Sequence, residues 1–341
     1  MKTIIHTLLI TNRITNIKMY DEIYKSLNIL SKNNGVNLYK HEQGYATHAL
    51  KDKGFTAIIL SKFKISEQYK HDYMQITIQL NPTKLLGRDK VELTKEQDLE
   101  EVEKRFNEVI ETIHLDLNTF MYWTLNRIDY AINIKTPYVK EYIELFQRGD
   151  IPYHFKMQYD KSAKTRKQRK GSCYLISKST IINFYDKFKE RLDNTGKEDE
   201  SAKDILRLEV QCLKSKTNAL KYKHSFEMKY LGYYLNEKLS LYIIRYYYDK
   251  TIGKGDYYKL DKAIEKVNLS DHTPGTKEKL ITVLKEVNSN RSIWKARQCT
   301  IFSVERFNHY LKLIRQLNIN PVTMPRRWSI DCLENLDSKI E

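Results

Sequence analysis

Two short segments of the chain each place an arginine and a carboxylate two residues apart: Arg127 with Asp129, and Arg207 with Glu209. In both segments these polar residues alternate with apolar ones, the pattern of a strand with one buried and one polar face. If both strands belong to one sheet, Asp129 and Glu209 share its polar face. Hard divalent cations prefer such oxygen ligands, completed by water and substrate phosphate. The pattern also fits a solvated sheet face with arginine–carboxylate pairs, and the sequence leaves both interpretations open.

A third feature is a tyrosine at the end of an apolar run. Residues 181–184 lead into Tyr185, and Lys187 follows two residues later. A tyrosine hydroxyl, with an ordinary pKa of about 10, becomes a nucleophile at neutral pH only where a cation or metal favours the phenolate. Lys187 is a candidate for that cation, or for a group that holds a phosphate oxygen. Because the chain has 25 tyrosines, most must be structural, and the pattern alone does not single out Tyr185.

The charge balance indicates a polyanionic partner. The 341 residues include 59 Lys and Arg against 43 Asp and Glu, a formal net charge of +16. This charge favours nucleic acid as the partner first and an anionic membrane surface second, although the codons of an AT-rich genome also enrich a chain in lysine.

No apolar run approaches the roughly 18 residues of a membrane span, and we expect residues 3–11 to form a strand. The four cysteines form no Cys-x-x-Cys pair, which favours a reducing, cytoplasmic compartment.

The stretch 156–170 is the densest basic run, with seven Lys and Arg against one Asp. We expect it to follow a DNA backbone, with Tyr159 available for base stacking; the alternative is a solvated loop. The residues expected to contact DNA are Arg127, Arg207, Lys164, Arg166, Lys167, Arg169, Lys170 and Lys178.

The basic run gives a testable prediction about salt. DNA affinity should fall steeply as the salt concentration rises, because neutralised phosphates release counterions. Replacing Lys164, Arg166, Lys167 and Arg169 with alanine should flatten the slope of log Kd against log salt concentration. An unchanged slope would identify the run as a solvated loop.

The elements that must position these residues are those of an α+β fold, with a mainly antiparallel central sheet flanked by helices. Strands are expected at 3–11, 54–62, 73–80, 125–134, 152–158, 173–176, 181–185 and 205–213. Helices are expected at 95–114, with a capping box of Thr94 and Gln97, and at 138–147. From about residue 225 the pattern becomes helical. We therefore predict a domain at 1–225 that carries the candidate catalytic residues and a helical C-terminal domain at 226–341, which would serve recognition of the DNA site or oligomerisation.

Four patches, in this order, resemble the rolling-circle replication initiators of small Gram-positive plasmids and the gene II replication proteins of filamentous phages. They are Arg-Ile-Asp at 127–129, Tyr-Leu-Ile-Ser-Lys-Ser at 174–179, Phe-Tyr-Asp-Lys at 184–187 and Leu-Arg-Leu-Glu at 206–209. The gene II likeness extends upstream to 76–86 and downstream to 307–326.

The resemblance implies a nickase. In these families a tyrosine, matched here by Tyr185, attacks one DNA phosphodiester and leaves a 5′-phosphotyrosine and a free 3′-OH primer. A divalent metal, Mg²⁺ or Mn²⁺, held by residues matching Asp129 and Glu209, polarises the scissile phosphate. The His-hydrophobic-His metal motif of many nickases is absent from the sequence. The third ligand therefore stays open, with His71 and His154 as candidates.

The sequence contains no P-loop for ATP-driven unwinding, so a replication initiator of this kind would need a host helicase and a DNA polymerase. Two other functions stay open. A relaxase acting at a conjugative transfer origin would use the same site chemistry. A non-enzymatic DNA-binding regulator would have Tyr185 packed in its core. The oligomeric state is also open, and a homodimer is one option.

Overall fold

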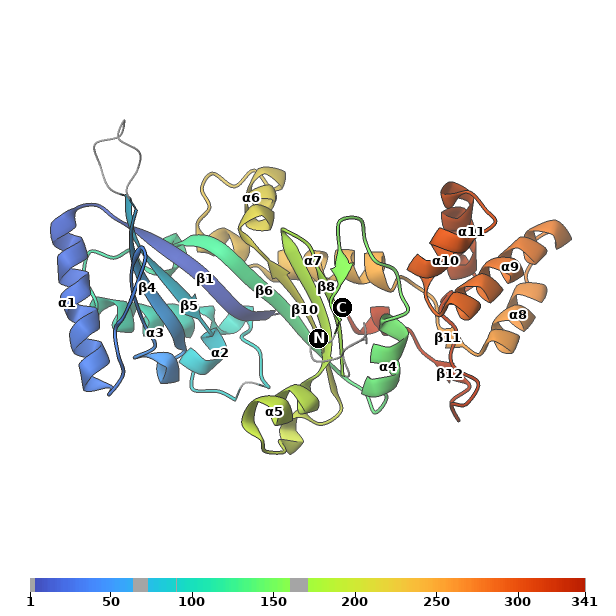
Figure 1. Ribbon diagram of the computed structural model, residues 1–341, viewed down its shortest axis with the longest axis horizontal. Helices are drawn as coiled ribbons and strands as arrows, with labels where there is room; N and C mark the ends of the chain where they lie inside the picture. The colour runs from blue at the N-terminus through green and yellow to red at the C-terminus, as the bar shows by residue number, and fades with distance from the viewer. Residues whose placement is uncertain (1–3, 64–72, 90, 160–170, 341) are drawn as a thin grey trace.

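The computed structural model describes residues 4–63, 73–89, 91–159 and 171–340 (Figure 1). Its centre is a ten-stranded antiparallel sheet in the order β2-β3-β4-β5-β1-β6-β10-β9-β8-β7. The strands are β1 (Ile4–Ile14), β2 (Tyr39–His41), β3 (Gly44–Thr47), β4 (Phe55–Phe63), β5 (Tyr73–Leu80), β6 (Thr124–Lys135), β7 (Lys156–Met157), β8 (Ser172–Ile176), β9 (Thr180–Asp186) and β10 (Ile205–Cys212). The α+β fold with a large antiparallel sheet, flanking helices and a helical C-terminal region is confirmed.

Helices cover the apolar face of this sheet. They are α1 (Ile17–Asn33), α2 (Pro82–Leu85), α3 (Leu99–Glu111), α4 (Val139–Phe146), α6 (Lys214–Lys223) and α7 (Glu237–Thr251). The alternation expected for β6 and β10 is present: Ile128, Tyr130 and Ile132 are fully buried on the covered face, as are Leu208 and Val210. Burial of such side chains contributes about 1.5–3 kcal/mol each, and it fixes which way the polar partners of the alternation point.

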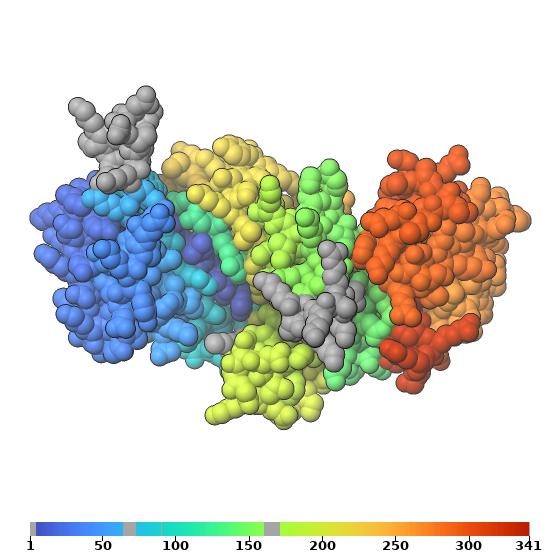
Figure 2. Space-filling view, in the orientation of Figure 1, coloured from blue at the N-terminus to red at the C-terminus, as the bar shows by residue number. Residues whose placement is uncertain are grey.

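The opposite face of the sheet is polar and less covered. Among the described helices, α5 (Lys187–Thr195), which follows β9 directly, borders this face near β9 and β10. Figure 2 shows a hollow on this side of the molecule, between the N-terminal strands and the yellow-green α5. The candidate catalytic residues lie on this face.

The C-terminal helices form a separate lobe (Figure 1). The lobe contains α8 (Leu260–Asn268), α9 (Pro274–Asn290), α10 (Ile293–Cys299) and α11 (Val304–Gln316), with a two-stranded ladder of β11 (Tyr257–Tyr258) and β12 (Cys332–Leu333). Helix α7, however, packs on β6 and β10. The domain boundary expected near residue 225 stays a prediction, since α7, which follows that residue in the chain, still contacts the sheet.

Local details differ from the sequence expectations at three places. Helix α1 was not expected. The strand expected at 152–158 is only the two-residue β7. The predicted capping box of Thr94 and Gln97 is wrong: the Thr94 hydroxyl bonds to the Thr83 hydroxyl at 3.0 Å, and the Asp98 carboxylate accepts the N–H of Lys95 at 2.7 Å.

No helix in the described part of the chain combines the length and apolarity needed to cross a bilayer.

Candidate active site

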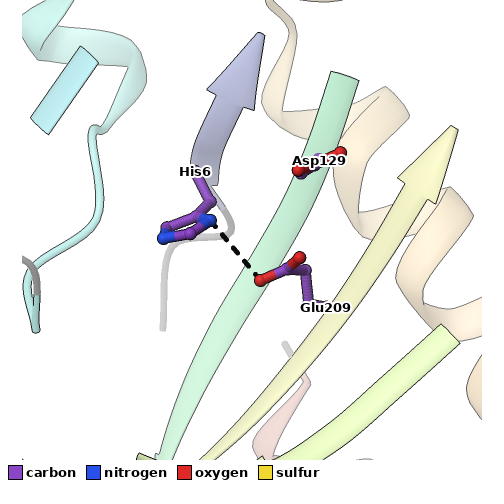
Figure 3. Close-up of side chains that lie close together, drawn as sticks. All are labelled: His6, Asp129 and Glu209. Atoms are coloured by element: carbon purple, nitrogen blue, oxygen red, sulfur yellow. Dashed lines mark ion pairs between the residues drawn. The ribbon is translucent and has the colours of Figure 1, made fainter. Parts of the chain in front are cut away.

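Three side chains from neighbouring strands meet on the polar face of the sheet: His6 of β1, Asp129 of β6 and Glu209 of β10 (Figure 3). One imidazole nitrogen and one oxygen from each carboxylate lie within 4.8 Å of one another. The strand register explains this, because Asp129 is paired with Gln211 and Glu209 with Ala131. The two acids are therefore diagonal neighbours on one face. The expectation that Asp129 and Glu209 share a polar face is confirmed.

His6 joins the two acids because β1 contains a bulge. Ile5 is paired with Tyr130 and Thr7 with Asp129, so His6 is the extra residue between two regular pairs. A bulge redirects a side chain relative to the regular alternation. Strand periodicity therefore could not place His6, and the one sequence signal was a histidine interrupting an apolar run.

The candidates proposed for a third metal ligand do not join this group. His154 is outside the one cluster of metal-ligating side chains found among the described residues, and its ring packs on Tyr153. His71 lies outside the described residues. The third side chain of the group is His6.

The two carboxylates have different partners. Asp129 accepts two hydrogen bonds from Arg127, with Nε at 2.7 Å from Oδ1 and Nη2 at 2.6 Å from Oδ2. Glu209 accepts one from the Gln211 amide at 2.7 Å, and its Oε2 lies 3.4 Å from His6 Nδ1. The expected arginine–carboxylate pairing thus exists at Asp129, which is also one of the three side chains of the His6–Asp129–Glu209 group.

Burial controls the ionisation of these groups. Burial, with the nearby Glu209 charge, raises the pKa of Asp129 to about 7 despite the Arg127 hydrogen bonds. For Glu209, burial raises the pKa, but His6, Gln211 and Arg207 outweigh it, and the pKa falls below its ordinary value. Burial lowers the pKa of His6 to about 4. The imidazole is therefore neutral at pH 7, the form that binds a metal.

Tyr185 reaches the same group. It is opposite Arg207 in the β9–β10 register and so diagonal to Glu209. Its hydroxyl donates to Glu209 Oε2 at 3.3 Å, and the residue is 7 % exposed. Burial, reinforced by the Glu209 charge, raises the pKa of Tyr185 well above its ordinary value. Without an added positive charge, the phenol stays protonated.

A cavity of about 410 Å³ opens over these residues. Arg127 lines it from β6, Asn183 from β9, and Lys189, Glu190 and Asp193 from α5. The Asn183 Oδ1 atom is buried, and no donor among the described residues reaches it. The cavity thus combines two cations, Arg127 and Lys189, with the acids and the tyrosine. The cations are the groups that could contact a phosphate, because the Asn183 oxygen and the carboxylates are hydrogen-bond acceptors like the phosphate itself.

Three expected site residues lie elsewhere. Lys187 touches the Tyr185 ring, with Nζ 5.8 Å from its centroid, but it is 2 % exposed, and its ammonium is held by Glu190 at 2.7 Å. It does not line the cavity, so its role as the cation that holds a phosphate oxygen has no support here. Lys178 lies in the β8–β9 turn, at the far end of β9 from Tyr185, roughly 20 Å away at the rise of an extended strand.

The expected contact between Arg207 and DNA is wrong. The residue is 0 % exposed, and its guanidinium donates to Asn133 Oδ1 at 2.7 Å and to the carbonyl of Val91 at 2.5 Å. It supplies positive charge beneath Glu209 and Tyr185 without reaching solvent. The other basic residues expected to contact DNA, Lys164, Arg166, Lys167, Arg169 and Lys170, lie outside the described residues.

The chain matches no protein-family model, and a search of curated proteins gives no match. The geometry of this site is therefore the main guide to function.

Proposed function

We propose that this protein is a metal-dependent DNA nickase that initiates rolling-circle replication of a plasmid or phage-like element. The observation that carries the proposal is the Tyr185 hydroxyl, placed 3.3 Å from a carboxylate of a buried His6–Asp129–Glu209 group and open to a polar cavity. A tyrosine in such a place has the parts that phosphoryl transfer needs, namely a nucleophile, a charge-neutralising centre and room for a phosphate.

The residues present fit a divalent cation. Two carboxylates and a neutral imidazole form a donor set suited to Mn²⁺. Mg²⁺ would use the two carboxylates and keep water at its other positions. Burial raises the pKa of Asp129 to about 7 and that of Tyr185 well above its ordinary value, so a bound cation would favour the charged form of both groups. A divalent cation bound by His6, Asp129 and Glu209 would polarise the scissile phosphate and favour the phenolate.

The chain's own residues would act as follows. The Tyr185 oxygen bonds to the phosphorus of one phosphodiester, and the bond from phosphorus to the 3′-oxygen breaks. The phenolic proton has Glu209 Oε2 as its nearest acceptor, and the departing 3′-oxygen takes a proton from water. Arg127, whose side chain is 29 % exposed in the cavity, would neutralise a non-bridging oxygen. The products are a 5′-phosphotyrosine and a free 3′-OH.

That 3′-OH would prime synthesis by a host DNA polymerase, with a host helicase separating the strands in the cytoplasm. Rejoining by the reverse reaction would close the circle. A relaxase would perform the same chemistry at a transfer origin. The two differ only in the DNA site chosen.

The test uses wild-type protein and a pool of labelled single-stranded oligonucleotides of random sequence, with Mn²⁺. A denaturing gel should show a labelled species migrating with the protein, and sequencing of the attached strands should reveal one enriched cleavage site. Binding without any denaturant-resistant species would favour the non-enzymatic regulator.

A further inference from the structure

A row of aromatic rings crosses the surface over α6 and α7. This ring row consists of Tyr233, Phe226, His224, Tyr242 and Tyr246. Consecutive ring centroids are separated by 5.2, 5.6, 6.3 and 6.3 Å, and the first two pairs are stacked, with interplanar angles of 12° and 21°. The rings come from the end of α6, the segment that follows it, and α7, so the fold assembles the row from separate pieces of chain.

The ring row joins the core at Phe226, which packs against the buried Tyr234, and its tyrosines lie at the surface. Tyr233, Tyr242 and Tyr246 are each 41 % exposed, whereas Tyr247 and Tyr248 of the same helix are buried. The tyrosines of residues 229–248 thus divide into two groups. The buried tyrosines stabilise the fold, whereas packing in the core does not account for the exposed ones.

Lysines surround the exposed rings. The ammonium of Lys223 lies 4.3 Å from the Tyr242 centroid, and those of Lys216 and Lys250 lie 5.7 and 5.8 Å from the Tyr246 centroid. The stretch 214–250 has seven lysines and one arginine against three acidic residues. Within the described part of the chain, none of these lysines forms an ion pair with a carboxylate. The surface therefore carries positive charge that the protein does not neutralise.

We propose that the ring row binds a single DNA strand, with unpaired bases stacked on the rings and phosphates held by the lysines. Spaced aromatic rings together with unneutralised lysines are the two features of a single-strand binding surface. A duplex would use the lysines but not the rings, because its bases already stack on one another. An acidic protein segment would also leave the row of rings unexplained.

This surface is distinct from the candidate active site. Helices α6 and α7 pack on the apolar face of β6 and β10, whereas Asp129 and Glu209 lie on the polar face of the same strands. A strand on the ring row is therefore not the segment in the cavity. The inference goes beyond the proposed nicking function and does not depend on it.

The test compares two double variants. Tyr242→Ala with Tyr246→Ala removes two rings, and Tyr242→Phe with Tyr246→Phe keeps them. The affinities of both variants and of the wild type are measured by fluorescence anisotropy for a labelled 20-residue oligothymidylate and a duplex of the same length, in EDTA so that no metal-dependent cleavage interferes. Tyr39→Ala, a change at a 53 % exposed tyrosine on β2, is the control for loss of a surface ring.

We expect the alanine variant to bind oligothymidylate about 10- to 100-fold more weakly, with duplex affinity unchanged. The phenylalanine variant and Tyr39→Ala should bind like the wild type. Because the substituted rings are largely exposed, all variants should melt like the wild type. They should also form the covalent adduct normally at saturating oligonucleotide, which separates this proposal from the nicking function.

Each of the other results overturns the proposal. The proposal is wrong if the wild type does not bind oligothymidylate, or if the alanine variant binds it as tightly as the wild type does. It is also wrong if the alanine variant loses as much affinity for the duplex as for oligothymidylate, or if the phenylalanine variant loses as much affinity for oligothymidylate as the alanine variant does. Displacement of oligothymidylate by a polyglutamate peptide that binds more tightly would instead identify an acidic protein as the partner.

Discussion

Replacing Tyr185 with phenylalanine should abolish the covalent protein–DNA adduct and the strand cleavage together. The change removes the one oxygen that would bond to phosphorus and keeps the ring that packs between β9 and α5. The lost hydrogen bond to Glu209 should cost about 0.5–1.5 kcal/mol of unfolding free energy, because a single buried pair is broken. DNA affinity should be unchanged. The measurement is a denaturing gel of the labelled adduct, combined with thermal melting.

Two further tyrosines serve as matched controls. Tyr130 is buried on the apolar face, where its hydroxyl donates to the carbonyl of Tyr234 at 2.9 Å, so Tyr130→Phe should lose comparable stability and keep the adduct. Tyr174 is paired with Asn183 across β8 and β9, on the face of the sheet that carries Tyr185, so Tyr174→Phe should also keep the adduct if Tyr185 is the nucleophile. Mass spectrometry of the linked peptide should identify Tyr185. An adduct at either control tyrosine, or one that persists in Tyr185→Phe, would exclude the assignment.

The sequence could predict most of the sheet and the polar face because both depend on a simple alternation. Apolar side chains at 128, 130 and 132 and at 206, 208, 210 and 212 must be buried, which sends Asp129 and Glu209 to the other side. Antiparallel pairing of β6 with β10 and of β10 with β9 then brings Tyr185 next to them. Each step follows from the two-residue period of a strand.

The features that sequence reasoning missed depend on long-range packing. His6 joins the site only through a bulge, which strand alternation does not encode. Arg207 shares the polar face with Glu209, but its guanidinium is capped by Asn133 and the carbonyl of Val91 from other parts of the chain. Lys187 starts α5, and the helix places Glu190 where it holds the ammonium away from the cavity. In each case the position of the side chain depends on a partner distant in sequence or on local backbone geometry.

The metal assignment predicts that Mn²⁺ stabilises the protein and that chelation abolishes the adduct. An ion that binds only the folded state at 100 times its Kd adds about 2.7 kcal/mol to the unfolding free energy, a shift of several degrees in Tm. Asp129→Asn, Glu209→Gln and His6→Ala should each remove most of this shift and most of the adduct, because the two amides lose the charge that holds the ion and alanine removes the imidazole. Oligonucleotide affinity in EDTA should stay near that of the wild type, which separates loss of the metal from loss of DNA binding.

The raised pKa of Asp129 in the metal-free protein determines how its stability changes with pH. The Asp129 pKa is raised from 3.8 to about 7 in the folded state, so between these values the folded protein binds more protons than the unfolded chain. The contribution of Asp129 to stability therefore falls as the pH rises from about 4 to about 7, and Asp129→Asn should remove that fall. Below pH 7 the ion must displace the Asp129 proton, so the Tm shift caused by Mn²⁺ should be larger at pH 8 than at pH 6. Equal shifts at both pH values, or full adduct formation in EDTA, would return Asp129 and Glu209 to a structural role in pairing with arginine.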